Sequence, residues 1–261
     1  MPASPFSLEN RIAIVTGGGV GIGRSIAIEF ARAGADVVVA SRKLENLEPV
    51  TAEIVKLGRR SFAMAVDVRQ EDAVKELVER TVRDLGRLDI MVNNAGASFR
   101  ANPEDITANG WNTVVGINLN GVFFGCKWAG RQMMAQGGGV IINVSSMYGM
   151  VGPDQRLYEE PDTLPAFKPV TYSVTKSAVY GLTKYLAAYW AGKKIRVNTL
   201  TLGGVENDQT PGFLQRYADR TPMRRMARPG EYCGALLFLA SDASSYMTGA
   251  NLVVDGGWTA W

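Results

Sequence analysis

Short apolar runs rich in β-branched residues alternate with longer segments of helical periodicity along the chain, and this alternation constrains the fold more than any other feature. The runs predicted as strands cover residues 11–16, 36–40, 61–66, 88–92, 140–144, 195–200 and 252–254. The segments predicted as helices cover residues 22–33, 44–57, 71–85, 111–134, 172–191 and 229–240. Strands that alternate with helices in this way are typical of α/β proteins with a parallel sheet.

The strands also indicate how the sheet is covered. Residues 37–39 and 140–142 are continuously apolar, as expected for strands that lie under helices on both faces. Helix ends are marked by glycines directly after three periodic runs: Gly34, Gly58 and Gly86. No linker interrupts the chain. The sequence therefore predicts a Rossmann-like, doubly wound, seven-stranded parallel sheet with helices on both faces, in a single domain over residues 1–261.

The composition argues against several classes of function. The 28 basic and 25 acidic residues are spread along the chain, so the charge gives no reason to expect a nucleic acid or a membrane as partner. The chain has no histidine, which excludes histidine triads, histidine metal ligands and histidine acid–base catalysis. Cys126 and Cys233 match no metal spacing and are expected to be buried free thiols. We therefore expect no bound metal. Since no signal peptide or membrane span is visible, we also expect a cytoplasmic protein.

A glycine-rich turn directly follows the first predicted strand and opens into the first helix. It reads T-G-G-G-V-G-I-G over residues 16–23. Glycines let the backbone approach a pyrophosphate, and the amides and dipole of the helix start favour its negative charge. A tight turn without a ligand is the alternative. The candidate cofactor-binding residues in this turn are Gly17, Gly19, Val20, Gly21 and Ile22.

The same segment also resembles a different nucleotide-binding loop. Residues 18–25 fit the pattern G-x-x-x-x-G-K-[ST] of nucleoside triphosphatases except at one position. Arg24 stands where that loop needs the lysine that reaches the β- and γ-phosphates. The mismatch favours a dinucleotide over a nucleoside triphosphate.

The residues after the second predicted strand bear on which dinucleotide is bound. An acidic residue there accepts hydrogen bonds from the adenosine ribose, whereas an arginine accommodates a 2′-phosphate. This chain has Ser41 and Arg42. The sequence therefore favours NADP(H) over NAD(H), with a merely solvated Arg42 as the alternative.

A tyrosine and a lysine four residues apart suggest an acid–base centre. Tyr172 and Lys176 are separated by about 6 Å of rise and about 40° around a helix, so they lie on one face. A nearby cation stabilises a phenolate, and lowering the pKa of a tyrosine from about 10 towards 7 takes roughly 4 kcal/mol, to which an oxidised nicotinamide would also contribute. Such a phenol can act as a general acid for ketone reduction and as a general base for alcohol oxidation.

The same spacing recurs at Tyr180 and Lys184 on the predicted helix, so the pattern alone is not specific. The second pair lies about 12 Å further along and is rotated by about 80°, so the two pairs cannot share a site. Tyr172 is preferred because it begins the helix, at the strand ends where a cofactor binds. The second pair is expected to be packing and solvated surface.

Two further features follow the fifth predicted strand. Ser146 could hold a substrate oxygen, although serine is also a common turn residue. Residues 150–170 carry four prolines and mixed charges, and we expect this inserted loop to be a lid over the substrate. A decorative surface insertion is the alternative.

Taken together, these segments resemble the short-chain dehydrogenase/reductase family in its compact single-domain branch, nearly end to end. The resemblance rests on the glycine turn, on residues 67–68, 93–96 and 253–257, and on the single residues Asn118, Ser146, Tyr172 and Lys176. Each piece is weak to moderate by itself, but their order is highly specific.

The resemblance implies a role for each matching residue. Tyr172 would be the acid–base group, Lys176 would also bind the nicotinamide ribose, Ser146 would polarise the substrate oxygen, and Asn118 would anchor a water in a proton relay. The cofactor contacts implied beyond the glycine turn are Asp67, Val68, Asn94, Ala95, Gly96 and Val205 together with Tyr172 and Lys176. A homotetramer built through the helices of residues 111–134 and 172–191 is also implied.

Two departures from the family pattern stand out. Ser146 and Tyr172 are 26 positions apart because the loop intervenes, and a longer loop adds little closure entropy. After the sixth predicted strand, the family's proline and glycine are replaced by L-G-G-V over residues 202–205, which leaves the nicotinamide carboxamide contact at Val205 less certain.

The sequence thus predicts an oxidoreductase that transfers hydride between a nicotinamide cofactor and a carbonyl or secondary alcohol. The charged loop favours a small polar substrate such as a sugar, sugar acid or polyol. A reductase of 3-oxoacyl or other hydrophobic ketones is one alternative, and a non-catalytic NADP(H)-binding sensor or scaffold is another.

Overall fold

The computed structural model describes residues 4–158 and 167–261, so residues 159–166 of the predicted lid lie outside the described residues. Seven parallel strands form one sheet in the order β3-β2-β1-β4-β5-β6-β7. Their bounds are β1 Ile12–Thr16, β2 Asp36–Ser41, β3 Ser61–Ala65, β4 Ile90–Asn93, β5 Gly139–Ser146, β6 Ile195–Leu202 and β7 Asn251–Val254. The order reverses direction beside β1, and this switch point is where open α/β sheets bind ligands. The predicted sheet is confirmed.

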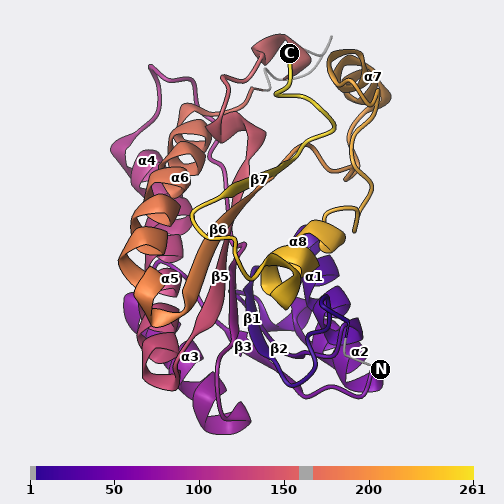
Figure 1. Ribbon diagram of the computed structural model, residues 1–261. Helices are drawn as coiled ribbons and strands as arrows, with labels where there is room; N and C mark the ends of the chain where they lie inside the picture. The colour runs from indigo at the N-terminus through magenta and orange to yellow at the C-terminus, as the bar shows by residue number, and fades with distance from the viewer. Residues whose placement is uncertain (1–3, 159–166) are drawn as a thin grey trace.

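Helices cover both faces of the sheet (Figure 1). One face carries α1 Gly21–Arg32, α2 Glu48–Lys56 and α8 Cys233–Ala240; the other carries α3 Glu71–Leu85, α4 Ala108–Val115, α5 Gly121–Gln136 and α6 Val170–Trp190. Strand residues alternate between the two layers: Val37 and Val39 pack under the first group and Val38 under the second. This alternation explains why the strands are apolar without a break.

The predicted strand boundaries differ from the structure by one or two residues throughout the sheet, and the shifts at β5 and β6 bear on the site. β5 and β6 each continue two residues beyond the predicted end, and Ser146 pairs with Leu202 in the last step of their ladder. Ser145 is tolerated inside the strand because its hydroxyl donates to the backbone oxygen of Lys176 at 2.8 Å. Ser146 therefore sits at the last position of a buried strand, and its hydroxyl also caps the 3-10 turn at Met147–Gly149 by accepting from the amide of Tyr148 at 3.2 Å.

Three of the predicted helices begin three or four residues away from their predicted start, while α1 and α6 differ by only one or two residues. Residues 44–57 divide at Leu47 into a short 3-10 turn and α2, and residues 229–240 form a helix only from Cys233 onward. The stretch before Cys233 is held in turns because the Glu231 carboxylate accepts from Arg225 and from the amide of Arg228. The segment predicted at 111–134 begins earlier, at Ala108, and contains a π-helical turn at Gly116–Asn120.

One helix was not predicted at all. Helix α7 covers Pro211–Arg220 and lies beyond the carboxyl end of the sheet, apart from both helical layers (Figure 1). Thr210 caps it by accepting from the amide of Phe213 at 3.2 Å, and Pro211 occupies its first turn. This Thr-Pro start was the local signal for a helix.

Two smaller expectations, the glycine helix ends and the buried thiols, are confirmed. Gly34, Gly58 and Gly86 all have positive φ angles at helix ends. Cys126 and Cys233 are buried free thiols. Across residues 4–158 and 167–261, no helix combines the length and the apolarity that crossing a bilayer requires.

Candidate active site

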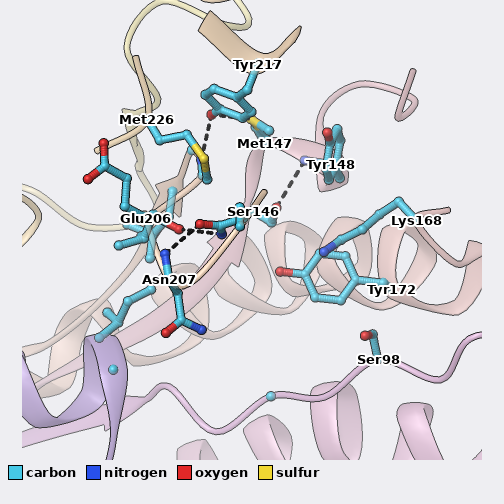
Figure 2. A pocket seen from close by; sticks show the side chains of 18 of the residues that line it. Ser98, Ser146, Met147, Tyr148, Lys168, Tyr172, Glu206, Asn207, Tyr217 and Met226 are labelled. Atoms are coloured by element: carbon cyan, nitrogen blue, oxygen red, sulfur yellow. Dashed lines mark hydrogen bonds between the residues drawn. The ribbon is translucent and has the colours of Figure 1, made fainter. Parts of the chain in front are cut away.

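A cavity of about 1150 Å³ opens at the carboxyl edge of the sheet. The glycine turn, the ends of β5 and β6, the start of α6, the segment after β6 and helix α7 all contribute to its walls. Figure 2 shows Tyr172 and Lys168 on one side of this cavity, Glu206 and Asn207 on the other, and Ser146 between them. The cavity lies at the carboxyl edge, where the sequence predicted the chemistry.

The glycine turn has the geometry that an anionic phosphate group needs. Gly17 and Gly21 have φ angles of +67° and +52°, which disfavour other residues. A Cβ atom at Gly23 would collide with the backbone oxygen of Gly17, whereas nothing lies within 4 Å of a Cβ at Gly21. Helix α1 begins at Gly21 behind Val20, which provides no side-chain cap. The first amides of α1 therefore remain available to a phosphate, so the turn fits a dinucleotide.

The segment after β4 is tied to the glycine turn. The side-chain amide of Asn94 donates to the backbone oxygen of Thr16 at 2.9 Å, and the Thr16 hydroxyl accepts from the amides of Asn94 and Ala95. Gly96 lies further in: a Cβ there would come within 3.6 Å of both Asn118 Oδ1 and Lys176 Nζ. Asn94 thus positions the backbone, while Gly96 leaves room beside the lysine.

The predicted adenosine-side residues lie at the ends of β2 and β3. Ser41 donates to the backbone oxygen of Lys43, and Arg42 is exposed and forms no ion pair with any described residue. The Asp67 carboxylate accepts from Arg69, and this hydrogen bond holds the pKa of Asp67 below its ordinary value. Arg42 is therefore the cation that remains available to a 2′-phosphate. The contacts of these residues with a cofactor stay predictions.

Arg24, the residue that argued against a nucleoside triphosphatase loop, faces another partner. Its guanidinium pairs with the Glu53 carboxylate of α2, and both side chains are partly exposed. The pair links α1 to α2 on the outside of the first layer. Arg24 has a structural role that does not require a phosphate.

Lys176 is buried at the base of the cavity. Its ammonium donates to the backbone oxygen of Val144 at 2.8 Å and lies 5.8 Å from the centre of the Tyr172 ring. Burial, with a smaller contribution from the positive charge of Lys168, lowers the pKa of Lys176 to about 8. The sheet thus holds a cation beside the phenol at a cost in solvation.

Tyr172 lies in the first turn of α6 and faces the cavity. Burial raises the pKa of its phenol, and the interaction with the Ser146 hydroxyl opposes this shift. The sequence led us to expect a pKa lowered by Lys176 together with an oxidised nicotinamide. The chain alone has the opposite balance, because desolvation outweighs the hydrogen bond with Ser146.

Asn118 lies in the π-helical turn and is fully buried. Its side chain accepts from the amide of Ala97 at 2.8 Å and donates to the Ala97 oxygen and to the Thr175 hydroxyl. The π turn is therefore clamped between the loop after β4 and helix α6. Such turns recur at functional sites. A role for Asn118 in a proton relay stays a prediction.

Comparison with known proteins decides the family. The family model described as enoyl-(acyl carrier protein) reductase matches residues 18–259. The chain belongs to the short-chain dehydrogenase/reductase family. It is 36% identical to 2-dehydro-3-deoxy-D-gluconate 5-dehydrogenase of Escherichia coli K12, over 100% of both chains.

Solved structures agree with this assignment to the short-chain dehydrogenases/reductases. A short-chain type dehydrogenase/reductase from Mycobacterium marinum superposes with a TM-score of 0.89 at 34% identity, covering 98% of this chain and 99% of the other. A gluconate 5-dehydrogenase from Burkholderia cenocepacia J2315, solved in complex with NADP and tartrate, has a TM-score of 0.88 at 33% identity and covers 98% of each chain. The protein is thus an oxidoreductase by family.

The second tyrosine–lysine pair of this short-chain dehydrogenase/reductase lies outside the cavity. The Tyr180 hydroxyl donates to the backbone oxygen of Ser146 at 3.0 Å and lies 3.0 Å from the Thr201 hydroxyl, while Lys184 is exposed. We expected packing and solvated surface, and Tyr180 does more: it supports the strand end that carries Ser146.

The described part of the inserted loop packs against α7. Leu157 is buried in a cluster with Tyr217, Met226 and Trp258, and its backbone oxygen accepts from Arg216 at 3.0 Å. Asp154 adds an ion pair with Arg220.

The segment around Val205 is held in a similar way: the amide of Gly204 donates to the Tyr217 hydroxyl at 2.7 Å, and Gln209 donates to the Val205 oxygen at 3.0 Å. Sequence reasoning missed α7 and Lys168 as cavity residues. The contact of Val205 with a carboxamide stays a prediction.

Proposed function

We propose that this chain transfers hydride between NADP(H) and the carbonyl or secondary alcohol of a small polyhydroxylated substrate, such as a sugar acid or a polyol. One observation carries the proposal: the Tyr172 phenol, the Ser146 hydroxyl and the Lys176 ammonium border one cavity, and the uncapped start of α1 borders its other end. That arrangement places an acid–base group beside a site for a pyrophosphate.

Each residue has a defined part in reduction. NADPH, when bound, would supply a hydride to the carbonyl carbon. Tyr172 donates its proton to the carbonyl oxygen, which becomes the hydroxyl, and Ser146 orients that oxygen by hydrogen bonding. Lys176 stabilises the phenolate that Tyr172 leaves behind, and Asn118 holds the loop after β4 against α6. Oxidation reverses these steps, with Tyr172 as the base.

The cofactor assignment depends on Arg42. Its exposed guanidinium suits a 2′-phosphate, and the complex of the gluconate 5-dehydrogenase with NADP supports the same choice. Titration of the chain with NADPH and NADH should give the tighter dissociation constant for NADPH, and Arg42→Ala should remove most of the difference. A clear preference for NADH would overturn the assignment.

The substrate class draws support from the relatives. Two of them are named for sugar acids, and one structure holds tartrate, a small polyhydroxylated acid. A relative from Thermotoga maritima that is 34% identical and is named 3-oxoacyl-[acyl-carrier-protein] reductase favours a second candidate, a 3-oxoacyl or other hydrophobic ketone. A panel of keto sugars, sugar acids, polyols and acyl thioesters, followed by NADPH absorbance, separates the two. Turnover of acyl thioesters alone would reject the polar substrate.

A non-catalytic sensor remains the competing class of function. Turnover in the wild type that disappears in Tyr172→Phe supports catalysis, because the variant keeps the ring and loses only the hydroxyl group. NADPH binding without turnover on any member of the panel would favour sensing.

We further propose a homotetramer that works in the cytoplasm. The outer surfaces of α5 and α6 expose large apolar side chains, among them Phe123, Tyr185 and Tyr189, which suit a subunit interface. The two buried free thiols suit a reducing compartment. Light scattering after gel filtration should give four times the chain mass, and a monomer would reject the assembly.

A further inference from the structure

Lys168 is held over the catalytic tyrosine by its own backbone. Its amide donates to the side-chain oxygen of Gln155 at 2.9 Å, and its carbonyl oxygen accepts from the same side chain at 3.1 Å. The ammonium lies 4.2 Å from the centre of the Tyr172 ring and 5.8 Å from that of Tyr148 (Figure 2). The two hydrogen bonds from Gln155 therefore fix the backbone from which the Lys168 side chain reaches the cavity.

The Lys168 ammonium has no acidic partner among the residues that the structure describes. Within residues 4–158 and 167–261 it forms no ion pair and no hydrogen bond, and burial lowers the pKa of its side chain. Two aromatic rings stabilise the charge only in part. A cation removed from water without a counter-ion is costly, so a ligand that supplies a negative charge here recovers binding energy.

Positively and negatively charged side chains line different sides of the cavity. Arg100 lines the cavity near Lys168, and its positive charge adds to the lowering of the Lys168 pKa. Glu206 and Asp208 also line the cavity, on the segment after β6, and Glu206 lies across from Lys168 in Figure 2. An anionic group is thus favoured at the Lys168 end and repelled at the other, which orients a substrate that carries one.

We propose that Lys168 binds the carboxylate of an acidic substrate beside the Tyr172 phenol and selects such acids over neutral polyols. The role rests on the proposed function, since it places the carboxylate in the pocket where the reacting C–O group meets Tyr172. Lys168 is a substrate-binding residue that belongs to the inserted loop, so the loop contributes specificity as well as cover.

The test compares two ligands with one carbon skeleton. L-tartrate and L-threitol share the central diol and differ only in carboxylates against hydroxymethyl groups. Calorimetric titration of the chain saturated with NADP⁺ should show tighter binding of tartrate. Lys168→Met should weaken tartrate roughly tenfold or more, the loss expected for one charge-assisted hydrogen bond, and leave threitol within about twofold. Lys168→Arg should retain most of the tartrate affinity.

Lys184→Met is the matched control, because it removes an exposed lysine of α6 outside the cavity. Equal binding of tartrate and threitol by the wild type, or unchanged tartrate affinity in Lys168→Met, would overturn the proposal. The readout is separate from turnover. If Lys168→Met weakens tartrate binding but the chain never oxidises NADPH, only the proposed function is rejected. If the chain turns over substrate but Lys168→Met leaves tartrate binding unchanged, only this role of Lys168 is rejected.

Discussion

Helix α6 carries the same tyrosine–lysine spacing twice, with two different outcomes. At the start of the helix, Tyr172 faces the cavity and Lys176 is buried against the Val144 backbone. Two turns later, Tyr180 bonds to the backbone oxygen of Ser146 and Lys184 is exposed. By sequence spacing alone the two pairs are equivalent. They differ in their distance from the carboxyl edge of the sheet, where the cavity lies.

The difference lies in what surrounds each lysine. Lys176 is held in a desolvated position 5.8 Å from the centre of the Tyr172 ring, whereas water screens the charge of Lys184. In the proposed function the first pair carries the chemistry at a cost in stability, and Tyr180 of the second pair supports the strand end that carries Ser146. Four substitutions test this contrast.

The largest effect is expected for Tyr172→Phe. Removing the proton that passes to the substrate oxygen should lower kcat by about 10²- to 10⁴-fold, with NADPH affinity nearly unchanged. Tyr180→Phe is the control on the same helix. Steady-state rates that fall equally in the two variants would erase the contrast.

Lys176→Met should reveal the solvation cost of the buried ammonium. The pKa of Lys176 is about 8 in the folded chain against an ordinary value of 10.5, so between these pH values the native state holds fewer protons than the unfolded chain. The solvation cost of the buried ammonium is fully present below pH 8. As Lys176 loses its proton, the free energy of unfolding of the wild type should rise by about 2 kcal/mol up to about pH 9.5.

Urea denaturation at a series of pH values measures that rise. Lys176→Met should lack it and should also lose activity, while Lys184→Met should keep it. Parallel pH profiles for the wild type and Lys176→Met would show that Lys176 keeps an ordinary pKa.

A smaller effect is expected for Tyr180→Phe. The variant loses the hydrogen bonds to Ser146 and Thr201, which should lower the free energy of unfolding by about 1 kcal/mol. Activity should fall less than about tenfold, because the strand end that carries Ser146 loosens but keeps its place in the ladder. A loss of activity as deep as that of Tyr172→Phe would assign Tyr180 to the chemistry.

The smallest effect is expected for Lys184→Met. Its side chain is exposed, so its removal should change the free energy of unfolding by less than about 0.5 kcal/mol. Thermal melting and NADPH oxidation should both resemble the wild type. A marked loss of either would indicate a contact of Lys184 in the assembled protein.

Much of this organisation could be predicted because it depends on local rules. Periodicity separates strands from helices, and parallel strands bring their carboxyl ends to one edge, which places Ser146 near Tyr172 without knowledge of any contact. The glycine turn could be predicted because glycine adopts positive φ angles readily, as Gly17 and Gly21 do.

The features that could not be predicted depend on contacts between distant segments. The π turn around Asn118 is clamped by the loop after β4 and by Thr175, and a helical pattern carries no trace of those partners. Lys168 reaches the cavity only because Gln155, 13 residues earlier, fixes its backbone. In the sequence, Lys168 was one of many charges in a loop.

The central claim is that Tyr172 exchanges a proton with the substrate oxygen. A crystal structure of the chain with NADP⁺ and a bound sugar acid tests it most directly. We predict that one substrate oxygen lies within about 3 Å of both the Tyr172 hydroxyl and the Ser146 hydroxyl, with its carbon facing the nicotinamide ring. A bound substrate whose reacting oxygen is held elsewhere, with Tyr172 turned away from the nicotinamide, would contradict the account.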